Sequence, residues 1–256
     1  VGFGICILGS IVSFSRGGFL ALVAVALYVI LRSRHRVASL VALAIVVAAI
    51  LPFIPAHWYA EMETITTSTE SGDTGEMRLY MWGIAWQVFL NHPLMGVGPA
   101  NFGRVAQGYQ DREAAADRGL HLWGVPCHSL YFTMLAEMGL SGAVTFVLLL
   151  VLLFLATSRT GSLLREWIKS TDSGSDASGL EEARRLFGAC RGLEGGMVGF
   201  LVAATFLTAN YYPIFWSLAG MMAATRLALA HDPALESVRA FAAERSPERS
   251  GSDGAC

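Results

Sequence analysis

The feature that most constrains this chain is a series of long apolar segments. They fall at residues 19–31, 37–54, 141–156, 197–212 and 214–230, and together they contain one charged residue. A helix needs ~20 apolar residues to cross the ~30 Å hydrocarbon core of a bilayer, and each segment approaches that length. Hydrophobic residues make up 54% of the chain and charged residues only 15%. These features exclude a water-soluble domain and predict a membrane protein.

A further apolar run at residues 2–14 would reach only ~20 Å as a helix, which is too short to cross the membrane alone. Because the chain starts at Val1 rather than at a methionine, we expect this run to be the second half of a helix that begins upstream. The sequence therefore predicts an all-α polytopic membrane protein, a bundle of about six transmembrane helices of which the first is truncated.

The distribution of basic residues predicts which loops face the cytoplasm. The connection at residues 32–36 carries three arginines and residues 159–191 carry six basic side chains, so both are expected inside. Residues 55–128 hold four arginines against eight acidic residues and are expected outside. The predicted organisation in a bacterial inner membrane is transmembrane helices at 1–54, a periplasmic loop at 55–128, a transmembrane helix at 129–157, a cytoplasmic loop at 158–192, a pair of transmembrane helices at 193–231 and a cytoplasmic polar tail at 232–256.

The large periplasmic loop is predicted to contain short interfacial helices. Residues 77–90 are mostly apolar and include tryptophans at positions 82 and 86, and tryptophan is enriched at membrane surfaces. Pro93, Gly96, Gly98 and Pro99 follow, and we expect them to end the helix.

Composition argues against several other kinds of function. The net charge is −2 and Lys169 is the single lysine, so the chain offers no basic patch for nucleic acid, and membrane lipids are its expected surroundings. The four cysteines lack a Cys-x-x-Cys spacing, and the outer loop has no Asp-x-Asp pair. We therefore expect no metal site and no cofactor.

Two arginines are candidates for binding an anion at the outer face. Arg16 stands between two apolar runs and is followed by two glycines, which permit a close approach of a ligand. Arg78 precedes Trp82 by four residues, so both project from one face of a helix. A guanidinium offers paired donors to the oxygens of a phosphate. The alternative for each is a solvated or snorkelling arginine at the interface.

His128 is the candidate for acid–base chemistry. It lies where the outer loop re-enters the membrane, and a histidine there can exchange a proton near neutral pH. The alternative is a residue that caps or packs against the helix. Glu137 follows nine residues later, on the opposite side of an unbroken helix, and is a candidate of second rank. Asn101 could orient a sugar or phosphate, or could cap a turn.

The order of these motifs resembles the O-antigen ligase and polymerase superfamily. The final spans, with Gly195-Gly196 and Asn210-Tyr211-Tyr212-Pro213, resemble the branch of exosortase-associated O-glycosylation ligases. The broader likeness rests on Ser15-Arg16-Gly17-Gly18, on Arg78 with Trp82, on residues 91–98 (NHPLMGVG) with Asn101-Phe102, on His128-Ser129 and on residues 136–139 (AEMG).

The resemblance implies a glycosyltransferase that moves a glycan from an undecaprenyl-pyrophosphate carrier to an acceptor hydroxyl at the periplasmic face. It implies a reaction without metal and with inversion at the sugar carbon. By likeness, Arg16 and Arg78 hold the pyrophosphate and His128 activates the acceptor, while Glu137, Asn101 and Trp82 are secondary candidates. The acceptor is a glycan, a lipid A core or a protein, so ligase, polymerase and protein O-glycosylation all stay open.

Two other functions compete with this interpretation. A transporter or flippase of lipid-linked saccharides would bind the same anion through arginines but would need no base. It would more often show inverted repeats and charges deep inside several spans, whereas the candidates here gather at the outer face. A purely structural subunit would leave the combination of Arg16, Arg78 and His128 unexplained.

Overall fold

The computed structural model describes Gly9 and residues 16–33, 35–50, 74–110, 122–171 and 177–245, and every regular element in these residues is a helix. Several predicted parts lie outside the described residues: the truncated span apart from Gly9, residues 51–54 of the transmembrane helices, residues 55–73 and 111–121 of the periplasmic loop, residues 172–176 of the cytoplasmic loop, and the tail from residue 246. The chain divides into two compact units. Unit 1 comprises Val1–Val147 and Val198–Tyr212, and unit 2 comprises Leu148–Met197 and Pro213–Cys256.

Three helices in the described part of the chain are long and apolar enough to cross a membrane. They are Leu130–Ser170, Ala177–Phe206 and Pro213–His231. Two shorter apolar helices cover Gly17–Arg32 and Arg36–Ile45. The predicted class of an all-helical membrane protein is confirmed, whereas the count of six spans and the sides of the loops stay predictions.

Two of these helices extend well beyond the apolar segments that predicted them. α8 covers Leu130–Ser170 and α9 covers Ala177–Ala203, so both continue into the stretch at 158–192 that was expected as a cytoplasmic loop. Hydropathy placed the ends of the apolar runs at residues 156 and 197 because charged residues begin there. Arginine, glutamate and lysine are good helix formers, so the helices continue past the apolar part.

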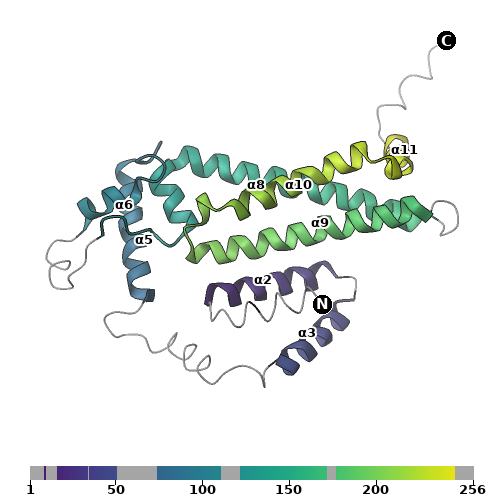
Figure 1. The fold of residues 1–256 in the computed structure, drawn as a ribbon, viewed down its shortest axis with the longest axis horizontal. Helices are drawn as coiled ribbons and strands as arrows, with labels where there is room; N and C mark the ends of the chain where they lie inside the picture. The colour runs from purple at the N-terminus through teal and green to yellow at the C-terminus, as the bar shows by residue number, and fades with distance from the viewer. Residues whose placement is uncertain are drawn as a thin grey trace, which may run out of the picture. The chain divides into compact units, whose positions relative to one another are not determined.

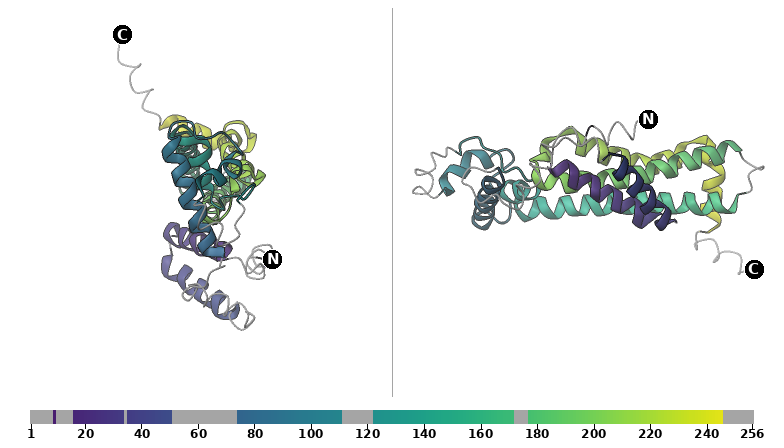
Figure 2. Two further views of the ribbon diagram at one scale, coloured as in Figure 1. Left: turned by 90° about the vertical axis from the view of Figure 1, so that its left-hand side faces the viewer. Right: turned by 90° about the horizontal axis from the view of Figure 1, so that it is seen from below.

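In unit 2, the parts of α8 and α9 that belong to this unit lie beside α10 (Pro213–His231) in all views (Figures 1 and 2). A short turn, η5 (Pro233–Leu235), leads into α11 (Glu236–Glu244). Leu235 and Val238 are buried with side chains from the ends of α8 and α9. The polar C-terminal segment therefore begins with a helix that covers the far end of the helix bundle in this unit.

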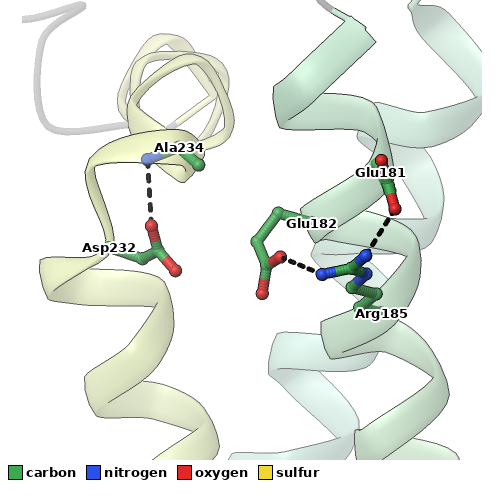
Figure 3. A network of polar contacts seen from close by, with 5 residues as sticks. All are labelled: Glu181, Glu182, Arg185, Asp232 and Ala234. Atoms are coloured by element: carbon green, nitrogen blue, oxygen red, sulfur yellow. Dashed lines mark hydrogen bonds and ion pairs between the residues drawn. The ribbon is translucent and has the colours of Figure 1, made fainter.

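The surface of unit 2 is stabilised by local polar contacts, which Figure 3 shows. Asp232 accepts a hydrogen bond from the backbone N–H of Ala234 at 2.9 Å and so caps η5. On α9, Arg185 pairs with Glu181 at 2.5 Å and with Glu182 at 3.7 Å. These pairs join residues three or four positions apart on one helix, and such exposed pairs stabilise little.

In unit 1, α2 (Arg16–Arg32) and α3 (Arg36–Ile50) form a hairpin (Figure 1). α2 crosses the last turns of α9 at Gly199, where a Cβ would lie 2.5 Å from the side chain of Val25. A glycine at this crossing lets the two backbones approach closely, as small residues do between membrane helices.

The rest of unit 1 is built on α5 (Thr74–Asn91), α6 (Phe102–Val105) and the turn η2 (Ala106–Tyr109). Figure 2 shows α5 and α6 beside each other, and they share one apolar core. The predicted interfacial helix at 77–90 is thus a helix with one side buried in protein. Its opposite side exposes three large apolar side chains that suit a membrane surface: Leu79, Trp86 and Leu90.

Candidate functional site

α8 is broken at Gly139, and this break organises the site. The backbone there has φ 62° and ψ −157°, a combination that is essentially restricted to glycine. A Cβ on Gly139 would lie 2.6 Å from the carbonyl carbon of Leu94, and a Cβ on Gly96 would lie 2.3 Å from the carbonyl carbon of Glu137. The two glycines therefore let segment 93–98 lie directly against the helix backbone.

Segment 93–98 replaces the hydrogen bonds that the helix loses at the break. In an unbroken helix, the N–H groups of residues 140 and 141 would donate to the carbonyls of residues 136 and 137. Here each of these four groups has a partner in segment 93–98 instead, so the break leaves none of them unpaired. The backbone bonds run from Leu140 to Pro93 (2.8 Å), from Ser141 to Leu94 (3.1 Å), from Val97 to Ala136 (3.0 Å) and from Gly98 to Glu137 (2.9 Å).

The side chain of Glu137 extends this junction to two further segments. It is 3% exposed, and its Oε1 accepts a hydrogen bond from the backbone N–H of Phe102 at 3.1 Å. Its Oε2 accepts from the hydroxyl of Tyr211 in η4 (Ala209–Tyr211). The Tyr211 oxygen in turn accepts from the backbone N–H of Ala100 at 2.8 Å. One buried carboxylate thus joins α8, the start of α6 and the turn before α10.

The electrostatics of this junction keep its hydroxyl and its neighbouring thiol protonated. Burial, the hydrogen bond to Glu137 and the negative charge of that carboxylate raise the pKa of Tyr211 to about 12. Burial, with a smaller contribution from Glu137, raises the pKa of Cys127 to about 12. Tyr211 therefore donates to Glu137 throughout the physiological range, and Cys127 is unsuited to act as a nucleophile.

His128 lies immediately before α8 in a left-handed backbone conformation, with φ 53°. Its N–H donates to Thr208 Oγ1 at 2.9 Å, which holds the strained residue in place. Helix capping is performed by Ser129, whose Oγ accepts from the N–H of Phe132 at 3.5 Å. The side-chain cap of α8 thus comes from Ser129, and the half-buried His128 lies one residue before it.

The charge of Arg78, on α5, acts on His128, which lies just before α8. Burial lowers the pKa of His128, and the positive charge of Arg78 lowers it further. Both side chains are partly exposed, so a ligand could reach them. A histidine beside a fixed cation is neutral over more of the physiological range, which is the form that accepts a proton.

The described geometry separates Glu137 from this pair. Because His128 stands outside α8 in a left-handed conformation, the helical spacing used to compare it with Glu137 does not apply. The charge of Glu137 acts instead on Cys127 and Tyr211. Glu137 therefore belongs to the junction of three segments described above.

Trp82 lies inside unit 1, where its ring packs between aromatic neighbours. It stacks on Phe132 with ring centroids 5.2 Å apart and a 16° angle between planes, and Phe206 lies at 6.3 Å. Its buried Nε1 has no hydrogen-bond partner among the described residues. Trp82 thus connects the turn of α5 that follows Arg78 with α8 and with η3 (Ala204–Phe206), the turn after α9.

Arg16 is the first residue of α2, and its side chain lies outside what the structure describes. Its neighbour Gly17 faces the ring of Phe206, to which a Cβ on that glycine would come within 3.5 Å. Phe206 also contacts Trp82. The start of α2 is therefore packed against the same aromatic group as the first turns of α5, which carry Arg78.

Asn101 is used within its own loop. Its side-chain amide donates to the carbonyl of Val97 at 3.1 Å, and it makes no side-chain cap on α6. Of the two interpretations offered by the sequence, the structure gives Asn101 a contact that stabilises a turn. Within the described residues, no three His, Cys, Asp or Glu side chains converge in a way that could hold a metal ion.

Two contributors to this region were not among the residues selected from the sequence. Thr208 and Tyr211 lie in the short connection between α9 and α10, yet they bond to His128 and Glu137 across 80 and 74 positions. The pair of tyrosines before Pro213 stood out only as a family likeness. A polar aromatic pair between two spans is a weak signal because it also suits a membrane interface.

These features define a membrane protein with apolar helices and a loop-rich unit in which the charge of an arginine lowers the pKa of a histidine. A family model described as O-antigen ligase matches residues 1–147, more than half of the chain, and this range includes Arg16, Arg78 and His128. No curated protein and no solved structure matches the chain. The chain belongs to the O-antigen ligase family, which carries out glycosyl transfer of the ligase or polymerase type at the membrane.

Proposed function

We propose that this chain transfers a glycan from an undecaprenyl-pyrophosphate carrier to an acceptor hydroxyl on the outer side of a bacterial inner membrane. The proposal is supported by the match to the O-antigen ligase family and by the effect of the Arg78 charge, which lowers the pKa of His128. The donor is a lipid-linked glycan, and the acceptor is a glycan, a lipid A core or a protein. Membership of the exosortase-associated branch stays a prediction.

The proposed reaction assigns one task to each side chain. The acceptor hydroxyl gives its proton to the neutral ring of His128, and its oxygen forms a bond to the anomeric carbon from the face opposite the carrier. The bond from that carbon to the phosphate oxygen breaks, and the pyrophosphate leaves with the electron pair, so the sugar carbon is inverted. Arg78 and Arg16 stabilise the negative charge that gathers on the leaving group.

Each residue type suits its task. A guanidinium keeps its charge at any relevant pH and presents parallel N–H donors, so it can hold a pyrophosphate without a metal ion. The positive charge of Arg78 also lowers the pKa of His128. A lower pKa keeps the histidine ring neutral, and the neutral ring is the form that can accept a proton. A transporter would need the arginines but would gain nothing from the histidine.

The assignment of the arginines is tested in the full-length protein. We expect Arg78→Ala to remove transfer, and Arg78→Lys to restore little of it, because a lysine lacks the paired donors. Arg16→Ala should have the same effect if the two arginines act together. EDTA should leave the rate unchanged. Normal transfer by both alanine variants at wild-type protein levels would contradict the proposed clamp.

The orientation in the membrane is part of the proposal, because the reaction needs the site to face outwards. Gln107 is exposed in η2, and Ser33 lies in the arginine-rich connection between α2 and α3. In intact cells, an impermeant thiol reagent should label Gln107→Cys above the background of the unsubstituted chain and should leave Ser33→Cys unlabelled until the cells are permeabilised. The reverse pattern would place the site in the wrong compartment.

A further inference from the structure

Unit 1 contains a cavity of about 290 Å³ that the proposed reaction does not yet use. Its walls come from four parts of the unit: segment 100–104, segment 123–127, the first turns of α8 and the turn around Thr208 and Tyr211. Neither Arg78 nor His128 lines it. Its volume approaches the range of small-molecule binding sites.

The lining combines one large exposed aromatic ring with several polar groups. Trp123 is 67% exposed, and Arg104 is also exposed beside the cavity. The wall also includes the buried carboxylate of Glu137 and the side chains of Tyr211 and Thr208, which carry hydroxyl groups. This combination suits a sugar ring, because the C–H face of such a ring can pack on a flat aromatic surface and its hydroxyls both donate and accept hydrogen bonds.

Two residues that line the cavity, Cys127 and Thr208, are also direct neighbours of His128. Thr208, whose Oγ1 accepts the hydrogen bond from the His128 N–H at 2.9 Å, also lines the cavity. Cys127, the residue before His128, lines it as well. The same short segment therefore presents Cys127 to the cavity and carries the histidine that interacts with Arg78.

The cavity wall carries one acidic and one basic side chain, Glu137 and the exposed Arg104, so it has no net positive charge to attract a pyrophosphate. Glu137 is buried at this wall, and its charge is strong enough to help raise the pKa values of Cys127 and Tyr211. A pyrophosphate placed here would be repelled by that carboxylate, whereas a sugar hydroxyl could donate to it. The cavity therefore suits the acceptor substrate, whose reacting end is a hydroxyl and carries no phosphate.

We propose that this cavity binds the sugar ring of the acceptor, with Trp123 as the surface on which the ring packs and Arg104 and Glu137 as hydrogen-bonding partners. The inference rests on the proposed transferase function and adds to it a separate place for the acceptor. The donor pyrophosphate occupies the side of His128 that faces Arg78, and the acceptor approaches from the side of Cys127 and Thr208.

The test compares three single substitutions in the full-length protein. Trp123→Ala removes the packing surface, Trp123→Phe keeps a flat ring, and Trp216→Ala is the control, since Trp216 is 59% exposed on α10 and does not line the cavity. If the proposed function holds, cells that lack this protein accumulate both the lipid-linked donor and the unmodified acceptor, and extracts from them supply the two substrates. Initial rates are measured against each substrate while the other is saturating.

We expect Trp123→Ala to raise the KM for the acceptor about tenfold or more and to leave the KM for the donor unchanged. Trp123→Phe should restore most of the acceptor affinity, and Trp216→Ala should match the wild type in both. An unchanged donor KM also shows that the variant is folded, which the high exposure of Trp123 favours.

Two results would overturn the inference. An unchanged acceptor KM in Trp123→Ala would make Trp123 a surface residue or a membrane anchor, and a rise in the donor KM alone would assign the cavity to the donor glycan. Both leave the proposed function intact as long as Arg78→Ala loses transfer in the same assay. If the wild-type protein transfers no glycan between these substrates, the proposed function fails, and the acceptor site fails with it.

Discussion

Units 1 and 2 differ in how regular their backbone is. Unit 2 consists of long helices, and three of its helical glycines, at positions 188, 192 and 220, have no neighbouring atom within 4 Å of an added Cβ. In unit 1, short segments cross each other, and added Cβ atoms at two glycines, Gly96 and Gly139, would collide with backbone. Within the described residues, every positive φ belongs to unit 1, at Gly96, Gly98, Ala100, Gly124, His128 and Gly139.

This difference indicates what each unit contributes. Strained backbone is maintained only where surrounding contacts hold it, and it is concentrated at functional sites. In unit 1 the strained positions surround Glu137 and His128, and the bonds that hold them join residues up to 111 positions apart. Regular helices such as those of unit 2 satisfy their backbone hydrogen bonds internally, and a surrounding membrane can cover their exposed apolar side chains.

The largest effect is expected at the break in α8. Gly139→Ala places a Cβ 2.6 Å from the backbone of Leu94 and forces an alanine into a region reserved for glycine. The conformational strain alone costs ~1–3 kcal/mol, and the collision adds to it, so we expect loss of the folded unit 1 and of transfer. The free energy of unfolding in detergent and the amount of membrane-inserted protein measure the effect.

The matched control for this substitution lies in unit 2. Gly188 is exposed on α9, and nothing lies within 4 Å of an added Cβ. Gly188→Ala should stabilise the helix by ~0.5–1 kcal/mol and leave transfer unchanged. Equal effects of the two substitutions, in either direction, would remove the contrast between the units.

An intermediate effect is expected at Tyr211. Tyr211→Phe removes the donor to Glu137 and the acceptor for the Ala100 N–H, and we expect a loss of roughly 1–2 kcal/mol together with weaker transfer. In unit 2, Arg185→Ala removes an ion pair whose side chains are 68% and 67% exposed, and it should cost less than ~0.5 kcal/mol. Thermal unfolding of both variants ranks them, and a larger loss in Arg185→Ala would contradict this account.

The sequence predicted the helical membrane class because apolar segments of spanning length leave few alternatives. The sequence prediction made α8 and α9 too short, because hydropathy shows which part of a helix is apolar but not where the helix ends. It also gave no sign that α8 breaks at Gly139. That break depends on a contact with segment 93–98, which is more than forty residues away in the chain.

For the candidate site, Arg78 and His128 were selected from the sequence, and in the structure the charge of Arg78 lowers the pKa of His128. Residue type and position in the predicted topology were enough to select them, because charged and titratable groups at a membrane surface are uncommon. Thr208 and Tyr211 were missed because their part in the site depends on how the connection after α9 packs. Those contacts also lie outside the range of the family match, which ends at residue 147.

The central claim is that His128 is the base of a transfer reaction, and His128→Gln tests it most directly. Glutamine keeps a hydrogen-bonding side chain but accepts no proton. We predict a transfer rate lower by ~100-fold or more, with binding of the lipid-linked donor unchanged because the arginines remain. The pKa of His128 is lowered from 6.5, so the wild-type rate should rise with pH through a midpoint below that value, and the variant should lack this rise. A near wild-type rate in His128→Gln, or loss of donor binding together with transfer, would contradict the claim.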